Sequence, residues 1–157
     1  MKRISGFTLI EVMIVIVLLS SVMIAVPTFY AFFAKQGVRL SADQLCADLQ
    51  LARMMAIRQD KTCSVVFNSP APNQYMNALS RNVVDLASYR GGVHFLASGP
   101  DGSKAARQIN FVRRGMATPA GSVFLADQKG ENIFQIKVLV PGGISASRWN
   151  GQRWEQL

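Results

Sequence analysis

The sequence has few of the residues that build catalytic and metal sites. It contains one histidine, His94, and two cysteines, Cys46 and Cys63, among 157 residues. A single histidine rules out a multi-histidine metal site, and the two cysteines lack the spacing of zinc ligands. The acidic residues are scattered, and no paired carboxylates, nucleotide-binding motif or catalytic triad can be assembled. We therefore expect no metal, no cofactor and no enzymatic activity.

A long apolar stretch near the start of the chain is the dominant feature that is present. After Lys2 and Arg3 the chain carries only one charged residue, Glu11, before Lys35. Residues 12–33 would rise about 33 Å as a helix, enough for a hydrocarbon core of about 30 Å. By the positive-inside rule, the basic start stays in the cytoplasm and the rest of the chain is exported.

Two simpler interpretations of this stretch fit poorly. A secretory signal peptide would carry a cleavage site of small residues after the apolar run, which here continues into bulky residues at 27–33. An ordinary signal anchor leaves Glu11 unexplained. A carboxylate costs roughly 2.5–3.5 kcal/mol at the centre of a bilayer and less near the interface, so Glu11 calls for a partner or a role.

The motif Gly6-Phe7-Thr8-Leu9-Ile10-Glu11, after a short basic leader and before an unbroken apolar helix, resembles the class III leader of type IV pilins and type II secretion pseudopilins. This resemblance implies that a prepilin peptidase cleaves between Gly6 and Phe7 and removes residues 1–6. It also implies N-methylation of Phe7. Residues 7–33 would remain as a membrane-spanning helix that later lies in a filament core.

Two residues of the apolar helix have expected roles of their own. In this family the carboxylate that matches Glu11 is thought to meet the terminal amine of Phe7 on a neighbouring subunit. A subunit that leaves the bilayer needs a partner for every charge it buries, so Glu11 is expected to act in assembly. Pro27 removes one backbone donor and predicts a kink or a local break in the helix.

From residue 34 to 58 the apolar pattern becomes one-sided. Apolar residues recur at three- and four-residue steps, and they are Val38, Ala42, Leu45, Leu49, Ala52 and Ala56. This spacing predicts an amphipathic helix, continuous with the first, that packs one stripe against a sheet. The stretch 45–58 is similar to the Ala-Arg-x-x-Ala-Ile-Arg pattern of H-type minor pseudopilins (GspH) and FimT/FimU-type minor pilins. Arg53 and Arg58 are interpreted as a solvated helix face.

Residues 62–157 are expected to be rich in β-strands. Alternating apolar residues bounded by Gly, Pro, Asn and Asp predict strands at 62–67, 92–96, 108–112, 122–126 and 133–140. The region 74–89 is ambiguous. The expected fold is α+β and pilin-like: a long N-terminal α-helix, membrane-spanning in its first half and amphipathic in its second, packed on a small antiparallel β-sheet domain. Residues 34–157 would form the exported globular part.

Other candidate sites are less well defined. An exported domain would place Cys46 and Cys63 in an oxidising compartment, where a single disulfide could form. Two free thiols packed as small apolar side chains are the preferred interpretation. Asp101-Gly102 and Asp127-Gln128 resemble calcium loops of some pseudopilins, but ligand density there is too low to predict a site.

The formal net charge of +8 predicts a surface that attracts nucleic acid, acidic lipid headgroups or an acidic partner, or one that only keeps the protein soluble. Arg148, Trp149, Arg153 and Trp154 could contact DNA through phosphate pairing and base stacking. A terminal hairpin whose tryptophans cover the core is preferred. FimT-like DNA-uptake pilins carry Gly-Arg-x-Arg in this region, and the different sequence at 143–146 weakens the DNA interpretation.

The function predicted on these grounds is that of a structural minor pilin or pseudopilin in a type IV pilus or a type II secretion pseudopilus, at filament initiation or at the tip. The alternatives are a DNA-binding minor pilin for DNA uptake and a membrane-anchored periplasmic hydrolase. Expected partners are other pilin or pseudopilin subunits, the prepilin peptidase, the inner-membrane assembly platform and membrane lipid. The expected location is the bacterial inner membrane, single-pass, with a cytoplasmic N-terminus and a periplasmic C-terminal domain, before extraction into the filament.

Overall fold

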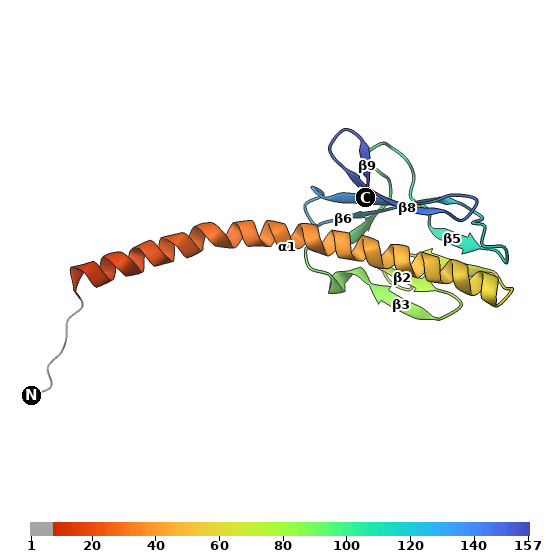
Figure 1. Cartoon of the computed structure of the whole chain (residues 1–157), viewed down its shortest axis with the longest axis horizontal. Coiled ribbons are helices and arrows are strands. Elements are labelled where there is room, and N and C mark those ends of the chain that lie inside the picture. Colours follow the sequence, from red (N-terminus) through yellow and green to blue (C-terminus); the bar gives the residue numbers. More distant parts are fainter. Residues whose placement is uncertain (1–7) are drawn as a thin grey trace, which may run out of the picture. The chain divides into compact units, whose positions relative to one another are not determined.

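The computed structural model of the chain describes residues 8–157, without the side chains of residues 24–31 and 34. The chain divides into two compact units, Met1–Phe33 and Ala34–Leu157. One helix, α1 (Leu9–Arg58), contributes to both and contains 50 residues (Figure 1). The predicted continuity of the apolar and amphipathic segments is therefore confirmed.

Some predictions fall outside the described part. Gly6 and Phe7 precede it, and the side chain of Pro27 is not included, so the cleavage site and the kink stay predictions. Over the residues that are described, no helix combines the length and hydropathy needed to cross a membrane.

Two antiparallel sheets make up the β-rich part of the second unit. The first has the strand order β3-β2-β1-β5, formed by β1 (Cys63–Phe67), β2 (Gln74–Asn77), β3 (Asn82–Asp85) and β5 (Gln108–Phe111). The second has the order β4-β6-β7-β8-β9, formed by β4 (His94–Leu96), β6 (Gly121–Ala126), β7 (Ile133–Val138), β8 (Ile144–Trp149) and β9 (Trp154–Gln156). A short 3₁₀ helix, η1 (Leu86–Ser88), follows β3. The α+β, pilin-like fold class is confirmed.

All five predicted strands are present. The last of them, β7, ends at Val138 instead of residue 140, because a turn begins there: Leu139 N–H donates to the Gly143 carbonyl at 2.8 Å, and Gly142 N–H donates to the Leu139 carbonyl at 2.8 Å. The ambiguous region 74–89 supplies β2, β3 and η1. The C-terminal hairpin consists of β8 and β9.

The predicted apolar stripe of α1 is the helical half of the core. All six of its residues are fully buried, namely Val38, Ala42, Leu45, Leu49, Ala52 and Ala56. They belong to one cluster with residues of both sheets, including Val65 and Phe111 of the first and Leu125 and Ile136 of the second. Burial of each large apolar side chain stabilises the fold by about 1.5–3 kcal/mol, so this stripe holds the helix on the sheets.

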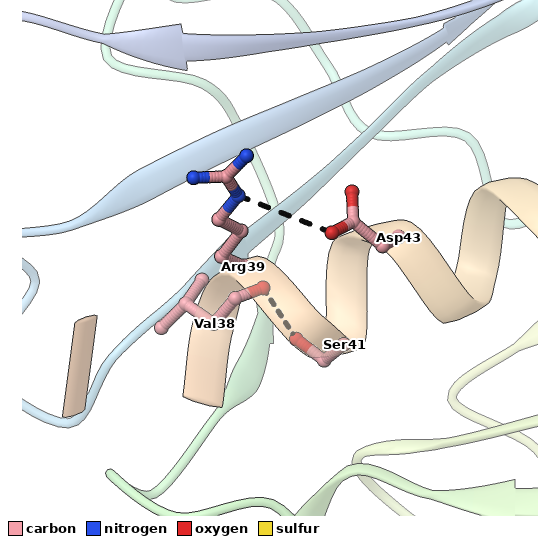
Figure 2. Close-up of polar contacts among 4 residues, drawn as sticks. All are labelled: Val38, Arg39, Ser41 and Asp43. Atoms are coloured by element: carbon pink, nitrogen blue, oxygen red, sulfur yellow. Dashed lines mark hydrogen bonds and ion pairs between the residues drawn. The ribbon is translucent and has the colours of Figure 1, made fainter. Parts of the chain in front are cut away.

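The α1 segment that opens the second unit also carries polar residues (Figure 2). Ser41 is fully buried, and its hydroxyl donates to the Val38 carbonyl at 2.8 Å, so no hydrogen bond is lost on burial. On either side of Ser41 in the sequence, Arg39 and Asp43 form an exposed ion pair with a 4.0 Å N–O distance. Exposed pairs of this kind contribute little stability, so packing of the buried stripe determines the position of the helix.

Candidate functional site

The first turn of α1 contains Glu11, the carboxylate expected to act in assembly. Thr8 caps this turn: its carbonyl accepts from the N–H groups of Glu11 (3.1 Å) and Val12 (3.3 Å), and its hydroxyl lies 3.4 Å from Glu11 N. Thr8 and Glu11 have the spacing of a capping box, a local signal that the sequence analysis did not use. A negative charge here also complements the positive end of the helix dipole. The spacing from Thr8 and the helix dipole both favour a carboxylate at position 11 within the subunit, and the role between subunits stays a prediction.

Over residues 12–23, which follow Glu11, α1 is apolar on all its sides. The described side chains of residues 9–23 are all exposed, and Leu9 and Met23 reach 79% and 77%. The two serines in this segment bond within the helix: the Ser20 hydroxyl donates to Ile16 O and the Ser21 hydroxyl to Leu18 O, each at 2.7 Å. Helices that are apolar all round are covered by lipid or by other helices, so this segment needs an apolar environment.

The C-terminal hairpin places its two tryptophans against each other and against Phe124. Trp149 and Trp154 are partners across β8 and β9, with ring centroids 5.1 Å apart. Trp154 also contacts the buried Phe124 at 5.7 Å, and its indole N–H donates to Asp101 Oδ2 at 3.0 Å. Trp149 is next to Arg148 in β8, and Arg148 is paired with the core residue Phe134, so the tryptophans lie on the opposite face of the second sheet. The hairpin therefore covers Phe124 on that outer face and not the core between the sheets and α1, which corrects the preferred interpretation.

The two arginines of the hairpin region lie in different surroundings. Arg153 is exposed in the turn, whereas Arg148 is half-buried opposite the core residue Phe134. Directly opposed residues share one face of a sheet, so Arg148 belongs to the face that carries the core. Its Nε is buried and has no hydrogen-bond partner among the described residues. The four residues suggested for DNA contact do not form one open aromatic and cationic surface.

Both cysteines are free thiols in the structure. Cys63 is buried, and its thiol donates to Asn77 Oδ1 at 3.1 Å. Burial raises the pKa of the half-buried Cys46 thiol from 9.0 to about 11, and the nearby Asp43 charge adds to the effect. The disulfide weighed on sequence grounds is not present in the structure, and Cys63 and Cys46 pack in and against the same apolar cluster, as the preferred interpretation expects.

The two loops compared with calcium sites use their carboxylates internally. Asp101 accepts from the Ser103 hydroxyl, from the Trp154 indole N–H and from Ser103 N–H, and these hydrogen bonds lower the pKa of its carboxyl group. Asp127 is buried and accepts from the backbone N–H groups of Glu131 and Asn132. Within the described part of the chain, no three His, Cys, Asp or Glu residues gather as a metal site would require.

A hollow of about 20 Å³ lies between α1 and the first sheet, bordered by Asp48, Tyr75 and Asn77 among others. That volume holds roughly one water molecule. The hollow is therefore a packing feature and not a binding site for an organic substrate.

Protein-family models match most of the chain. A model described as a prokaryotic N-terminal methylation motif matches residues 1–27, and one described as type II transport protein GspH matches residues 41–142. No curated protein matches the chain.

Two solved structures are similar to the chain, both of the type IV minor pilin FimU from Pseudomonas aeruginosa (strain PAO1) in different crystal forms. The first has 14% identity, a TM-score of 0.56, and coverage of 78% of this chain and 96% of FimU. The second has 16% identity, a TM-score of 0.50, and coverage of 74% and 95%. At these identities the likeness concerns the fold.

Proposed function

Because the chain belongs to the family of type II transport protein GspH, a family of pilin-like structural subunits, we propose that it is a minor subunit that helps to start or cap a pseudopilus or pilus. The observation that carries the proposal is the presence of an N-terminal methylation motif and a GspH domain in one chain. The long helix and two-sheet fold, similar to that of FimU, supports the same role.

The proposed route to the filament begins in the inner membrane. The apolar stretch anchors the subunit as a single-pass protein, with its N-terminus in the cytoplasm and its C-terminal unit in the periplasm. A prepilin peptidase cleaves between Gly6 and Phe7, and Phe7 is methylated. The inner-membrane assembly platform then moves the subunit from lipid into contact with other subunits. Because the exposed apolar face at residues 9–23 leaves one apolar environment for another, this transfer never exposes it to water.

Glu11 determines the axial position that the subunit takes relative to its neighbour in the filament. A carboxylate that enters an apolar filament core needs a partner, and the new amine on Phe7 of a neighbouring subunit supplies one. The cap at Thr8 begins α1 only three residues before Glu11, so the carboxylate lies on an ordered helical turn. An ordered turn is suited to setting the axial step between subunits.

Two features of the molecule argue against DNA uptake and against hydrolysis. The tryptophans that could stack on bases are packed against each other and on Phe124. A hydrolase would need acid and nucleophile groups that converge in a pocket, and the hollow beside Asp48 holds only about one water molecule.

The first test is the intact mass and N-terminal residue of the protein isolated from its native membrane. A chain that begins with methylated Phe7 supports the proposal, and one that begins with Met1 contradicts it. The variant Gly6→Ala should keep the leader, because the peptidase is expected to require glycine at that position. Gly143→Ala is the matched control: an alanine Cβ there would meet only Leu139 Cδ1, at 3.7 Å, so processing should be normal.

The position in the filament needs a separate test. Deletion of the protein should lower the number of filaments far more than their length, since an initiating or capping subunit acts once per filament. Quantitative mass spectrometry of purified filaments should find this chain well below the major subunit in abundance. Equal abundance of the two would contradict a minor role.

A further inference from the structure

Arg53 joins the end of α1 to two turns that are far away in the sequence. Its Nε donates to the Gly115 carbonyl at 3.1 Å, and its Nη2 donates to the Pro141 carbonyl at 3.5 Å. The two turns also touch each other, because a Cβ at Gly142 would overlap the Gly115 carbonyl oxygen. The last turns of α1, the turn after β5 and the turn between β7 and β8 therefore meet at one end of the unit Ala34–Leu157.

We call this end the basic end and define it as residues 53–61, 112–117 and 139–143. The basic end has a single acidic residue, Asp60, which forms an exposed ion pair with Arg113 at 3.8 Å. It contains five cations, namely Arg53, Arg58, Lys61, Arg113 and Arg114. Arg58, Lys61 and Arg114 are exposed and form no ion pair with any residue that the structure describes. Five cations and one anion give this end a formal charge of +4.

On α1 and in the first sheet, the acidic residues lie away from the basic end. Asp48 precedes Arg53 by five residues, a rise of about 7.5 Å, and accepts a hydrogen bond from Tyr75 of the first sheet. Asp43 lies still earlier on the helix. Strand β1 begins beside the basic end, whereas Asp85 closes β3 next to the other end of β1. None of these carboxylates offsets the charge of the basic end.

In the second sheet the acidic residues lie toward the opposite strand ends. The β7–β8 turn belongs to the basic end, so in an antiparallel sheet the β6–β7 and β8–β9 turns lie at the other end. Asp127 and Glu131 are in the β6–β7 turn. Asp101 is bonded to Trp154 at the start of β9, and Glu155 is the next residue of that strand. The charge of +4 is therefore not neutralised from this sheet.

Apolar side chains are exposed at the same end. Of the nine large hydrophobic residues that are exposed in this unit, five belong to the basic end: Met54 (65%), Ile57 (50%), Met116 (42%), Leu139 (45%) and Val140 (61%). A Cβ at Gly115 would lie 2.7 Å from Ile57 Cδ1, so the turn after β5 rests on the helix. Ala117 N–H donates to the Val140 carbonyl at 2.9 Å, which brings the β7–β8 turn beside Met116. The basic end thus combines positive charge with exposed apolar surface.

This composition is typical of a protein–protein interface. Arginine and methionine are enriched in such interfaces, and lysine is depleted. Four of the five cations of the basic end are arginines, and two of its five exposed apolar residues are methionines. The basic end contains no aromatic residue on which a nucleic-acid base could stack. A partner that only neutralises charge would also leave the apolar side chains in water.

We propose that the basic end docks an acidic protein surface that has an apolar centre. The apolar centre covers Met54, Ile57 and Met116, and surrounding carboxylates pair with Arg58 and Arg114. Complementary charge of this kind speeds association and disfavours partners of the wrong sign. Two copies of this chain would not join through their basic ends, because like charges repel. The inference adds a partner chemistry to the proposed function, and it rests on that function for the presence of other subunits.

Photo-cross-linking in the producing cell tests the inference on the full chain. A photoreactive phenylalanine analogue replaces Met116, and proteins that become cross-linked to it are identified by mass spectrometry. Val83 is the matched control position, because Val83 and Met116 are both 42% exposed and Val83 lies on β3, outside the basic end. We expect one protein to be cross-linked at Met116 and not at Val83. No protein adduct at Met116, or the same adducts in equal yield at both positions, would overturn the inference.

Charge reversal tests whether the partner is held by its carboxylates. Arg58→Glu with Arg114→Glu should lower the yield of the Met116 adduct about tenfold, since each change replaces attraction by repulsion. Arg58→Lys with Arg114→Lys should keep most of the adduct. The matched control is Arg107→Glu with Arg153→Glu, two exposed arginines outside the basic end that have no ion pair in the described part of the chain. Equal loss in both Glu variants would indicate general charge attraction and contradict the basic end.

The identity of the adduct and the N-terminus of the same sample complete the test. A partner with a net acidic exposed surface supports the inference, whereas a net basic protein, a nucleic acid or a second copy of this chain overturns it. A chain that begins with Phe7 but gives no adduct at Met116 contradicts only the basic end. A chain that begins with Met1 and still gives the acidic adduct contradicts only the proposed function.

Discussion

The Tyr75 hydroxyl donates a 2.6 Å hydrogen bond to Asp48 Oδ2, and this contact joins β2 to the middle of the buried half of α1. Tyr75 is only 2% exposed, and its ring also meets Phe95 of the other sheet at 6.4 Å. Burial and the bond to Asp48 both raise the pKa of Tyr75 far above its ordinary value. One side chain thus connects the helix with both sheets.

Tyr75→Phe should lower the free energy of unfolding by about 1–2 kcal/mol, because it removes a hydrogen bond to a carboxylate while the ring contacts remain. Urea denaturation of the full chain in detergent measures the change. Tyr89→Phe is the matched control, since the Tyr89 hydroxyl makes no hydrogen bond among the described residues, and it should change the free energy of unfolding by less than about 0.5 kcal/mol. Equal effects of the two variants would contradict a specific role for the contact with Asp48.

Gly37→Ala should destabilise the second unit although alanine favours helices. Replacement of a helical glycine by alanine contributes up to about 1 kcal/mol of stability, but here the new Cβ would overlap the Arg90 carbonyl oxygen. Forcing backbone apart typically costs about 1–3 kcal/mol, so we expect a net loss. Thermal unfolding of Gly37→Ala, compared with Gly143→Ala, checks whether the melting temperature falls. A stabilised Gly37→Ala would show that α1 is not fixed against the backbone of Arg90 at this point.

Raised pKa values predict that stability falls in alkali. A thiol or phenol whose pKa is higher in the folded state holds its proton there while the unfolded chain releases it. The stability that the raised pKa of Cys46 contributes is therefore complete below pH 9. It is lost as the pH rises from 9.0 toward the folded pKa of this thiol, about 11. Tyr75 adds a loss in the same direction above its ordinary range.

Reactivity of Cys46 tests the same shift without unfolding the protein. At pH 8 its reaction with a disulfide reagent should be roughly tenfold slower than that of a free cysteine, because about a hundredfold less thiolate is present while a more basic thiolate is about tenfold more nucleophilic. Asp43→Asn should speed the reaction, since the Asp43 charge helps to raise the pKa of this thiol. Asp60→Asn is the control and should leave the rate unchanged; an equal increase in both variants would contradict the assigned cause.

Glu11→Ala should impair incorporation into filaments while leaving the protein in the membrane. Thr8→Ala separates the two roles of this turn, since it removes the capping hydroxyl but keeps the carboxylate. Filament incorporation relative to membrane content, measured by immunoblot of sheared and membrane fractions, should fall for Glu11→Ala alone. Equal loss in both variants would assign Glu11 to helix capping, and normal assembly of Glu11→Ala would remove the assembly role.

Much of the fold could be read from local patterns. The six buried residues of α1 follow from three- and four-residue spacing, because a helix repeats every 3.6 residues and places such positions on one face. Strand β1 follows from alternation between turn residues. Strands β2 and β3 could not be assigned from the sequence. β3 is a short edge strand whose residues are mostly exposed, so its sequence carries little pattern.

The sequence by itself determined the apolar stretch, the leader motif with Glu11, the amphipathic stripe and the α+β class, since each depends on neighbouring residues and a fixed period. Only the tertiary structure decided which face Arg148 occupies, because a shift of one residue in strand register would reverse it. The contact of Trp154 with Asp101, 53 positions apart, and the meeting of Gly37 with Arg90 likewise depend on how the sheets and helix close on one another. Such long-range packing has no signal in the local sequence.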